Sequence, residues 1–400
     1  MTDANPTHRA GSQKKMVVVS FVGNPMLNTD GNLVRIRNVL QFLVESDFNV
    51  TFYSFVGTSV WPWSANDEID FRASFPTVSL VRDRRNFGLS LVQHLKSKLT
   101  ALAPTLTAKI VAITVPGLTP EWSRLRAEYP DAIFLLNYAM NATQLNGVDL
   151  SRACIETHDL CFRALALSRR HPIWHWYIVR YMRRELSILD AARVVLSISR
   201  TEHTVFETLL QSSKIYYLPP NMKPQNEPKP SKAKKIDLLF LGSGNYKNVR
   251  GINGFLELYR TWKLKPTLAI AGNVSSHVQV HPASDSSVSI MGHVESLPRL
   301  YESVRAVICP VDGTGVNIKI LEALAHGKPA FATRAAIEAL PKGSEECVFP
   351  LSETCIREVL ADPDKLRAAS TAALKYVDSS HIRSLWADFG QALRDLLNGA

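Results

Sequence analysis

Residues 309–333 read CPVDGTGVNIKILEALAHGKPAFAT. An apolar run over Ala306–Cys309 predicts a strand, and Gly313-Thr314-Gly315 predicts a turn. Helical periodicity follows from about Asn317 to His326, and a second apolar strand is expected over Ala330–Thr333. A strand, a glycine turn and a helix in that order direct free backbone N–H groups and the positive helix end toward one point. We therefore expect an anion site here, best suited to phosphate.

Two charged side chains on the predicted helix extend this site. Lys319 and Glu322 are three residues apart and share a helix face. A cation beside a phosphate site and a carboxylate one turn further suit a nucleoside diphosphate, with Lys319 near the phosphates and Glu322 on the ribose hydroxyls. The ligand-site candidates of this stretch are Gly313, Thr314, Gly315, Val316, Asn317, Lys319 and Glu322. The alternative is an ordinary structural turn, because glycine turns of this kind occur in any α/β protein.

The stretch resembles the C-terminal signature of GT-B glycosyltransferases, specifically the retaining family four. The matching residues are Pro310, Gly313, Gly315, Lys319, Glu322, Ala323, Ala325, Gly327, Pro329 and Thr333. One position departs from the pattern, because many members carry a glutamate where Thr314 stands here. The resemblance implies an α/β chain with GT-B architecture, in which two doubly wound Rossmann-like domains face each other across a cleft.

Composition is consistent with two domains and an acidic ligand. Four hundred residues exceed what one hydrophobic core usually organises. The formal net charge of +10 favours nucleotide phosphates or an anionic membrane face as partners. Nucleic acid is not expected, because we find no helix-turn-helix, zinc-finger or aromatic sheet signature.

The spacing of the cysteines and the hydropathy of the chain indicate the cellular compartment that we expect for the protein. The five cysteines lack C-x-x-C spacing, which argues against a zinc site or a disulfide framework and favours reduced thiols in the cytoplasm. No apolar stretch reaches the length of a transmembrane helix. Any membrane contact is therefore expected to be peripheral, at the inner face of the membrane.

The chain divides into five parts on composition and periodicity. Pro and Lys without apolar periodicity mark a linker, and strand–helix alternation on either side marks the domains. We expect a disordered tail over 1–15 and an N-terminal Rossmann-like domain over 16–221, which binds the acceptor and includes a strand at 110–115. A linker over 222–235 leads to a C-terminal Rossmann-like domain over 236–378, which binds the nucleotide sugar. A helix over 379–400 is expected to pack back on the N-terminal domain.

The resemblance also implies site residues in the N-terminal half. Gly31 lies in the loop after the first strand, where family members let the backbone approach sugar and phosphates. His158 follows a short strand and matches the histidine that faces the donor sugar, so we take it as the catalytic candidate in a binding or polarising role. Asp159 is adjacent and could instead cap a helix or orient its neighbour.

A basic and aromatic segment runs from Phe162 to Arg184 without any Asp or Glu. Arginine and tryptophan together on helices suit a membrane interface or a lipid-phosphate acceptor. The acceptor or membrane candidates are Arg169, Arg170, Trp174 and Trp176. The alternative is a helix that covers the core and carries solvated arginines.

Further donor-site candidates come from the second domain. Arg250 matches the family cation that precedes a glycine and contacts the diphosphate, and Lys247 competes for the same role. His293 and Val294 follow a glycine after a predicted strand, at the position where family members contact the base.

The resemblance implies transfer of a sugar from a nucleotide-diphosphate sugar, with retention of anomeric configuration, to a hydroxyl acceptor such as a lipid-linked glycan or polysaccharide. It implies no bound metal and no other cofactor. A nucleotide-sugar epimerase and a non-catalytic nucleotide-sugar-binding subunit remain alternatives. A dinucleotide-dependent oxidoreductase is disfavoured, because no G-x-G-x-x-G follows the first predicted strand at Met16–Val22.

Overall fold

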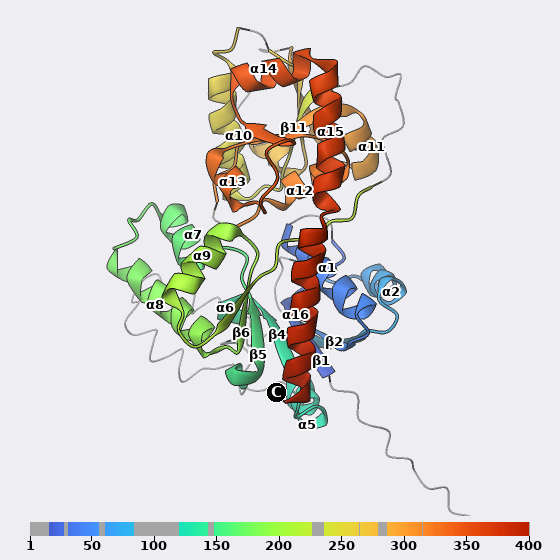
Figure 1. The fold of residues 1–400 in the computed structure, drawn as a ribbon, viewed down its shortest axis with the longest axis vertical. Coiled ribbons are helices and arrows are strands. Elements are labelled where there is room, and N and C mark those ends of the chain that lie inside the picture. The colour runs from blue at the N-terminus through green and yellow to red at the C-terminus, as the bar shows by residue number, and fades with distance from the viewer. Residues whose placement is uncertain are drawn as a thin grey trace, which may run out of the picture.

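A computed structural model describes residues 16–27, 31–55, 61–83, 120–142, 148–225, 236–263, 265–278, 286–313 and 315–399. The predicted tail over 1–15, the predicted strand at 110–115, Thr314 and residues 226–235 of the predicted linker lie outside these ranges. The described residues form two α/β units stacked along the long axis of the molecule (Figure 1).

The N-terminal sheet has the order β3-β2-β1-β4-β5-β6-β7, and its neighbouring strands run parallel. The order reverses between β1 and β4, which makes this the switch point where the carboxyl ends of strands leave room for a ligand. The strands are β1 (Met16–Val22), β2 (Asn49–Phe55), β3 (Ser79–Asp83), β4 (Ile133–Asn137), β5 (Ala153–Glu156), β6 (Val194–Ser197) and β7 (Lys214–Tyr217).

The C-terminal sheet repeats this plan with the order β10-β9-β8-β11-β12-β13, again with parallel neighbours. Its strands are β8 (Ile236–Leu241), β9 (Leu268–Ala271), β10 (Val288–Gly292), β11 (Val304–Cys309), β12 (Ala330–Ala332) and β13 (Val348–Pro350). Two doubly wound parallel sheets confirm the predicted fold class.

Helices cover both sheets, as parallel sheets require. In the N-terminal domain they are α1 (Gly31–Glu45), α2 (Ala65–Ser74), α5 (Pro120–Glu128), α6 (Ala139–Ala142), α7 (Cys161–Arg169), α8 (Trp176–Ala191) and α9 (Arg200–Leu209), with a 3-10 turn η1 (Leu150–Arg152). In the C-terminal domain they are α10 (Tyr246–Tyr259), α11 (Leu297–Glu302), α12 (Ile318–Ala325), α13 (Arg334–Ala339), α14 (Glu353–Ala361) and α15 (Pro363–Val377), with η2 (Asn273–His277).

The last helix, α16 (Ser380–Asn398), crosses from the C-terminal domain onto the N-terminal one, and Figure 1 shows it alongside β1 and β4. Its buried apolar side chains share one core with residues of β1, α1 and β2. The Trp386 indole donates to the carbonyl of Pro219 at 2.9 Å. Burying this amphipathic face ties the end of the chain to the first domain.

None of the helices in the described ranges is both long enough and apolar enough to cross a bilayer.

Candidate functional site

The predicted anion site begins where β11 ends, and the start of α12 shapes it. Asn317 is the N-cap residue of α12, and its side-chain oxygen accepts a hydrogen bond from the Lys319 amide at 3.1 Å. Its side-chain NH2 group donates to the Cys309 sulfur at 2.8 Å. Val316 is buried in the core of the C-terminal domain. Asn317 and Val316 therefore fix the backbone that follows the glycine turn.

The two domains touch at this turn, in a contact that we call the seam (Asp159, Lys247 and Gly315). The Gly315 amide donates to Asp159 Oδ1 at 3.2 Å, and the Lys247 ammonium pairs with Asp159 Oδ2. A Cβ atom at Gly315 would lie 2.2 Å from the carbonyl oxygen of His158, so no larger residue fits. The carboxylate of Asp159 thus lies on the amide and the cation that a phosphate would use.

A second contact between the domains lies at the start of α1. A Cβ atom at Gly31 would approach the Ile318 side chain to 3.3 Å. The structure therefore brings Gly31 and His158 of the N-terminal domain to the glycine turn and to α12 of the other domain. Both lie beside the switch point of the first sheet, where a doubly wound fold binds ligands.

Lys319 and Glu322 form an ion pair one turn apart on α12. The Lys319 ammonium donates to Glu322 Oε2 at 2.8 Å, and both side chains are mostly buried. Arg37 from α1 faces the same carboxylate: burial lowers the pKa of Arg37, and Glu322 partly offsets that effect. Arg37 in turn donates to the carbonyl of Leu27 at 2.8 Å and to that of Pro25, which fixes the first strand–helix loop.

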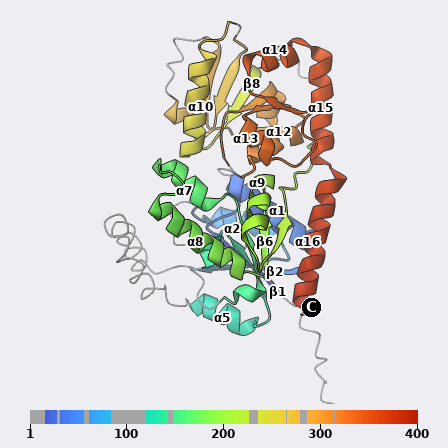
Figure 2. The same ribbon diagram turned by 60° about the vertical axis from the view of Figure 1, so that its left-hand side comes forward.

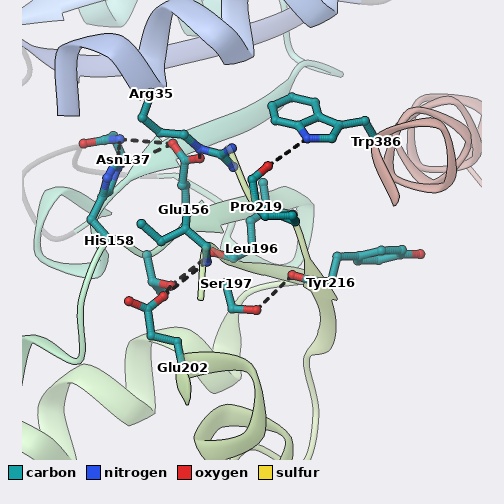
Figure 3. A network of polar contacts seen from close by, with 12 residues as sticks. Arg35, Asn137, Glu156, His158, Leu196, Ser197, Glu202, Tyr216, Pro219 and Trp386 are labelled. Atoms are coloured by element: carbon teal, nitrogen blue, oxygen red, sulfur yellow. Dashed lines mark hydrogen bonds and ion pairs between the residues drawn. The ribbon is translucent and has the colours of Figure 1, made fainter. Parts of the chain in front are cut away.

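His158 belongs to a buried polar cluster, which we call the buried network (Arg35, Asn137, Glu156 and His158) (Figure 3). Arg35 donates to Glu156 Oε1 at 2.6 Å, and Asn137 donates to Glu156 Oε2 at 3.2 Å. The His158 ring lies 2.5 Å from the Asn137 amide and 3.5 Å from Glu156 Oε2.

The charge of Glu156 is set by this network. Burial by itself raises the pKa of Glu156, but the Arg35 guanidinium and His158 outweigh burial and lower it to about 2. An ionised carboxylate directed at His158 fixes the orientation of the imidazole. His158 Nδ1 is buried and has no hydrogen-bond partner among the described residues, so it remains available to a ligand.

The Tyr138 ring packs against the His158 ring in a tilted arrangement. The two ring centroids lie 4.6 Å apart, and the Tyr138 hydroxyl accepts a hydrogen bond from Asn32 at 2.7 Å. Tyr138 has a φ of 67°, a backbone conformation that is costly for a residue other than glycine. The tyrosine thus joins the start of α1 to the histidine.

Glu202 is a second buried carboxylate near the seam. Its Oε2 accepts hydrogen bonds from the Thr157 hydroxyl at 2.9 Å and the Ile198 amide at 3.2 Å, whereas its Oε1 has no partner among the described residues. Oε1 lies 3.5 Å from where a Gly315 Cβ would be. Burial and the nearby Asp159 raise the pKa of Glu202 to about 8.

The other predicted donor-site residues are less tightly placed. Arg250 is exposed on α10 and donates to the Tyr246 hydroxyl at 3.4 Å, whereas Lys247 reaches the seam. Val294 packs on a satellite core that includes Ala323 of α12, and His293 precedes it. Thr314, where the family glutamate is absent, is outside the described residues.

The predicted acceptor or membrane residues lie apart from the seam. Arg169 is exposed at the end of α7, Arg170 and Trp174 are exposed in the connection between α7 and α8, and Trp176 is exposed at the start of α8.

Sequence reasoning missed the buried partners of the site. Arg35, Glu156 and Glu202 were not among the predicted site residues. For Glu202 the one available signal was its place three residues after Ser199, the N-cap of α9.

Known proteins show the same fold. Residues 235–362 match the family described as Glycosyl transferases group 1, so the C-terminal domain carries the sequence pattern of that family. No curated protein matches the chain in sequence.

Solved structures are similar over nearly the whole chain. Sucrose-phosphate synthase from Thermosynechococcus elongatus superposes with a TM-score of 0.66 at 13% identity, covering 96% of this chain and 100% of that one. A TarM variant from S. aureus, solved with fondaparinux, alpha-GlcNAc-glycerol and UDP, gives 0.65 at 8% identity with coverages of 96% and 100%. WaaG, a glycosyltransferase involved in lipopolysaccharide biosynthesis, gives 0.60 at 13% identity with the same coverages. These likenesses establish the GT-B fold.

Proposed function

We propose that this chain is a retaining glycosyltransferase that moves a hexose from a nucleotide-diphosphate sugar to a hydroxyl of a glycan or lipid-linked acceptor. The observation that carries the proposal is the seam, where a glycine-turn amide and a lysine from one domain already hold an anionic group from the other. Two further findings support it: the match of residues 235–362 to Glycosyl transferases group 1, and the GT-B fold.

Breaking the bond between the sugar and the diphosphate leaves negative charge on the departing diphosphate. In this proposal the Gly313 and Gly315 amides, Lys247 and Lys319 would stabilise that charge without a metal ion, and Arg250 would add a further cation from α10. Asp159 would have to leave the Gly315 amide as the diphosphate arrives. Glu322 would then exchange part of its contact with Lys319 for ribose hydroxyls.

His158 would face the donor sugar in a binding or polarising role. Its ring is oriented by Asn137 and Glu156 on one edge and by Tyr138 on one face. The free Nδ1 atom could hydrogen-bond a sugar hydroxyl. A preorganised imidazole of this kind loses little entropy when the sugar binds.

The test is in two steps. First, thermal unfolding is followed with uridine, guanosine and thymidine diphosphates and their sugars, because a ligand that binds only the folded state raises the midpoint by mass action. Second, the stabilising sugar nucleotide is incubated with candidate acceptors, and the anomeric configuration of the product is read by NMR.

The comparison variants are Lys319→Ala and the control Lys375→Ala, an exposed lysine on α15 of the same domain. We expect the first to abolish the nucleotide-dependent shift and the second to keep it. Isomerised sugar nucleotide without acceptor would indicate an epimerase, and binding without turnover would indicate a non-catalytic subunit. No shift with any nucleotide would overturn the proposal.

A further inference from the structure

We propose that the tip of the α7–α8 hairpin, residues 167–176, docks on the surface of an anionic phospholipid bilayer. Figures 1 and 2 both show this hairpin projecting from the side of the N-terminal domain, on the opposite side from α16. We call these ten residues the hairpin tip. Docking on a membrane goes beyond sugar transfer, and it holds whether or not the chain transfers a sugar.

Large apolar side chains concentrate at the hairpin tip. Of the nine large hydrophobic residues that are exposed in the described structure, four lie within these ten residues: Leu167, Ile173, Trp174 and Trp176. Trp174 is 79% exposed and Trp176 is 56% exposed, so neither contributes much to the core. Such a local cluster marks a contact surface rather than scattered surface apolarity.

The same hairpin carries uncompensated positive charge. Six arginines and no acidic residue lie between Phe162 and Arg184: Arg163, Arg169, Arg170, Arg180, Arg183 and Arg184. All six side chains are exposed, and none of them forms an ion pair with another described residue. An anionic surface is the partner with complementary charge.

The nearest carboxylate does not neutralise this charge, because it is already engaged. Glu185 of α8 is buried and accepts hydrogen bonds from the Cys161 amide at 3.0 Å and the Phe162 amide at 2.8 Å. It therefore caps the N-terminal end of α7, where a carboxylate is favoured by the helix dipole. The sequence thus places a carboxylate, Glu185, at the N-terminal end of α7 and no carboxylate at the hairpin tip.

The hairpin tip is held in one shape. Arg170 ends α7 in a left-handed conformation, with φ 55°, and Pro172 follows two residues later. The rings of His171 and His175 stack with centroids 4.0 Å apart, and His175 accepts a hydrogen bond from the Tyr177 amide at the start of α8. A preformed tip presents its tryptophans and arginines together at low entropic cost.

A bilayer interface satisfies both kinds of side chain at once. Tryptophan is enriched at headgroup depth, where its ring is amphipathic, and arginine binds lipid phosphates while its stem packs on apolar surface. On α8, Trp176, Arg180 and Arg183 recur at helical spacing and share one face. The basic face of α8 therefore continues from a tryptophan of the hairpin tip.

The position of the hairpin links this surface to the site. Helix α7 starts at Cys161, two residues after Asp159 of the seam. Nine helical residues span about 13 Å, so the hairpin tip lies at roughly that distance from the seam. If the chain transfers sugars as proposed above, this arrangement places a lipid-linked acceptor in the membrane surface near the donor site.

The test measures binding of the full chain to vesicles of phosphatidylcholine alone and of phosphatidylcholine mixed with phosphatidylglycerol, by co-sedimentation at low and high salt. We expect binding only to the anionic vesicles, weakened by salt because charge contacts are screened. Replacing Arg169 and Arg180 by glutamine should weaken binding about fivefold for each arginine. Replacing Trp174 and Trp176 by alanine should weaken it by a further tenfold or so, through lost apolar burial.

The matched control replaces Leu258 by alanine and Arg260 by glutamine, an exposed apolar and basic pair at the C-terminal end of α10 in the other domain. This control and Lys319→Ala should bind vesicles like the parent chain. A loss of vesicle binding can therefore be told apart from a loss of nucleotide binding. The thermal midpoint of each variant reports folding, and exposed side chains should leave it unchanged.

Three results would overturn the proposal. One is the absence of binding to anionic vesicles, and another is binding that the tip variants leave unchanged. The third is a dimer in sedimentation velocity that the tryptophan variants abolish, which would mean that a second copy of the chain covers the tip.

Discussion

The two sides of the domain junction treat their charges differently. In the buried network, Arg35 and Glu156 have fully buried side chains and pair with each other. On the C-terminal side, Lys247 and Lys319 keep 35% and 22% of their side chains exposed, and each pairs with a carboxylate at the edge of the site. One side is closed to solvent, and the other remains in contact with it.

This difference teaches which contacts can change when a ligand arrives. Breaking a buried pair leaves an uncompensated charge in the interior, whereas a lysine that keeps part of its side chain in solvent can exchange a carboxylate for a phosphate at lower cost. We infer that the buried network holds His158 in place, while Lys247 and Lys319 exchange partners on donor binding. The predictions below test that division.

The largest effect is expected from Arg35→Ala, which leaves Glu156 charged and buried. The free energy of unfolding should fall by about 3–5 kcal/mol, as for other broken buried pairs. Urea unfolding at neutral pH measures this loss. The double variant Arg35→Met, Glu156→Gln should cost less than the sum of the single changes, because neither partner is left charged. An additive cycle would mean that the pair is not coupled.

Lys319→Ala tests the C-terminal side, where we infer that lysines exchange a carboxylate partner for a phosphate. The rate of sugar transfer should fall by about 10²–10³-fold, because a cation is removed from the departing diphosphate. The free energy of unfolding should change by less than about 0.5–1 kcal/mol, because the pair with Glu322 is partly exposed. A loss of stability as large as that of Arg35→Ala would erase the distinction between the two sides.

Glu202 sharpens the comparison, because it is buried on the N-terminal side without a cation. Its folded pKa of about 8 lies above the ordinary value of 4.5, so the folded chain keeps a proton that the unfolded chain loses in that interval. The resulting stability is fully present below about pH 4.5 and is lost as pH rises through about 8. Glu202→Gln removes the titrating carboxyl group, so the free energy of unfolding of this variant should not show the loss.

Between about pH 5 and pH 9, the parent chain should therefore lose about 4 kcal/mol of unfolding free energy relative to Glu202→Gln. Urea unfolding at each pH gives the two curves. Parallel curves would show that the carboxyl group of Glu202 does not titrate in this range.

The smallest effect is expected from Asp159→Asn. This change removes the charge that occupies the Gly315 amide and Lys247, so nucleoside diphosphate should bind about two- to fivefold tighter. Isothermal titration measures the change, with Asp131→Asn, an exposed carboxylate of the same domain, as the control. Weaker binding in Asp159→Asn would mean that the carboxylate assists the ligand instead of competing with it.

Much of the fold could be predicted from local patterns. The helix expected from about Asn317 to His326 is α12, Ile318–Ala325, with its two predicted end residues as caps. The strand expected over Met16–Val22 is β1. Both succeed because an apolar run, a capping residue and a glycine act on the neighbouring backbone. The GT-B architecture, in contrast, was implied by the resemblance of residues 309–333 to a family signature, and the two parallel sheets agree with it.

The partners in the site were less predictable. Arg250 was preferred to Lys247 by resemblance, yet Lys247 contacts Asp159. Two cations three residues apart on one helix point in nearly the same direction, so sequence does not say which one meets the other domain. The roles of both residues in donor binding stay predictions.

By itself, the sequence determined the strand, turn and helix that form the anion site, because these depend on residues within a few positions of one another. Only the tertiary structure decided that Asp159 lies on the Gly315 amide, 156 residues away, and that Arg35 pairs with Glu156, 121 residues away. Such pairs depend on how two packed domains bring distant backbone together. Burial then decides their strength, since it removes the water that would otherwise solvate each charge.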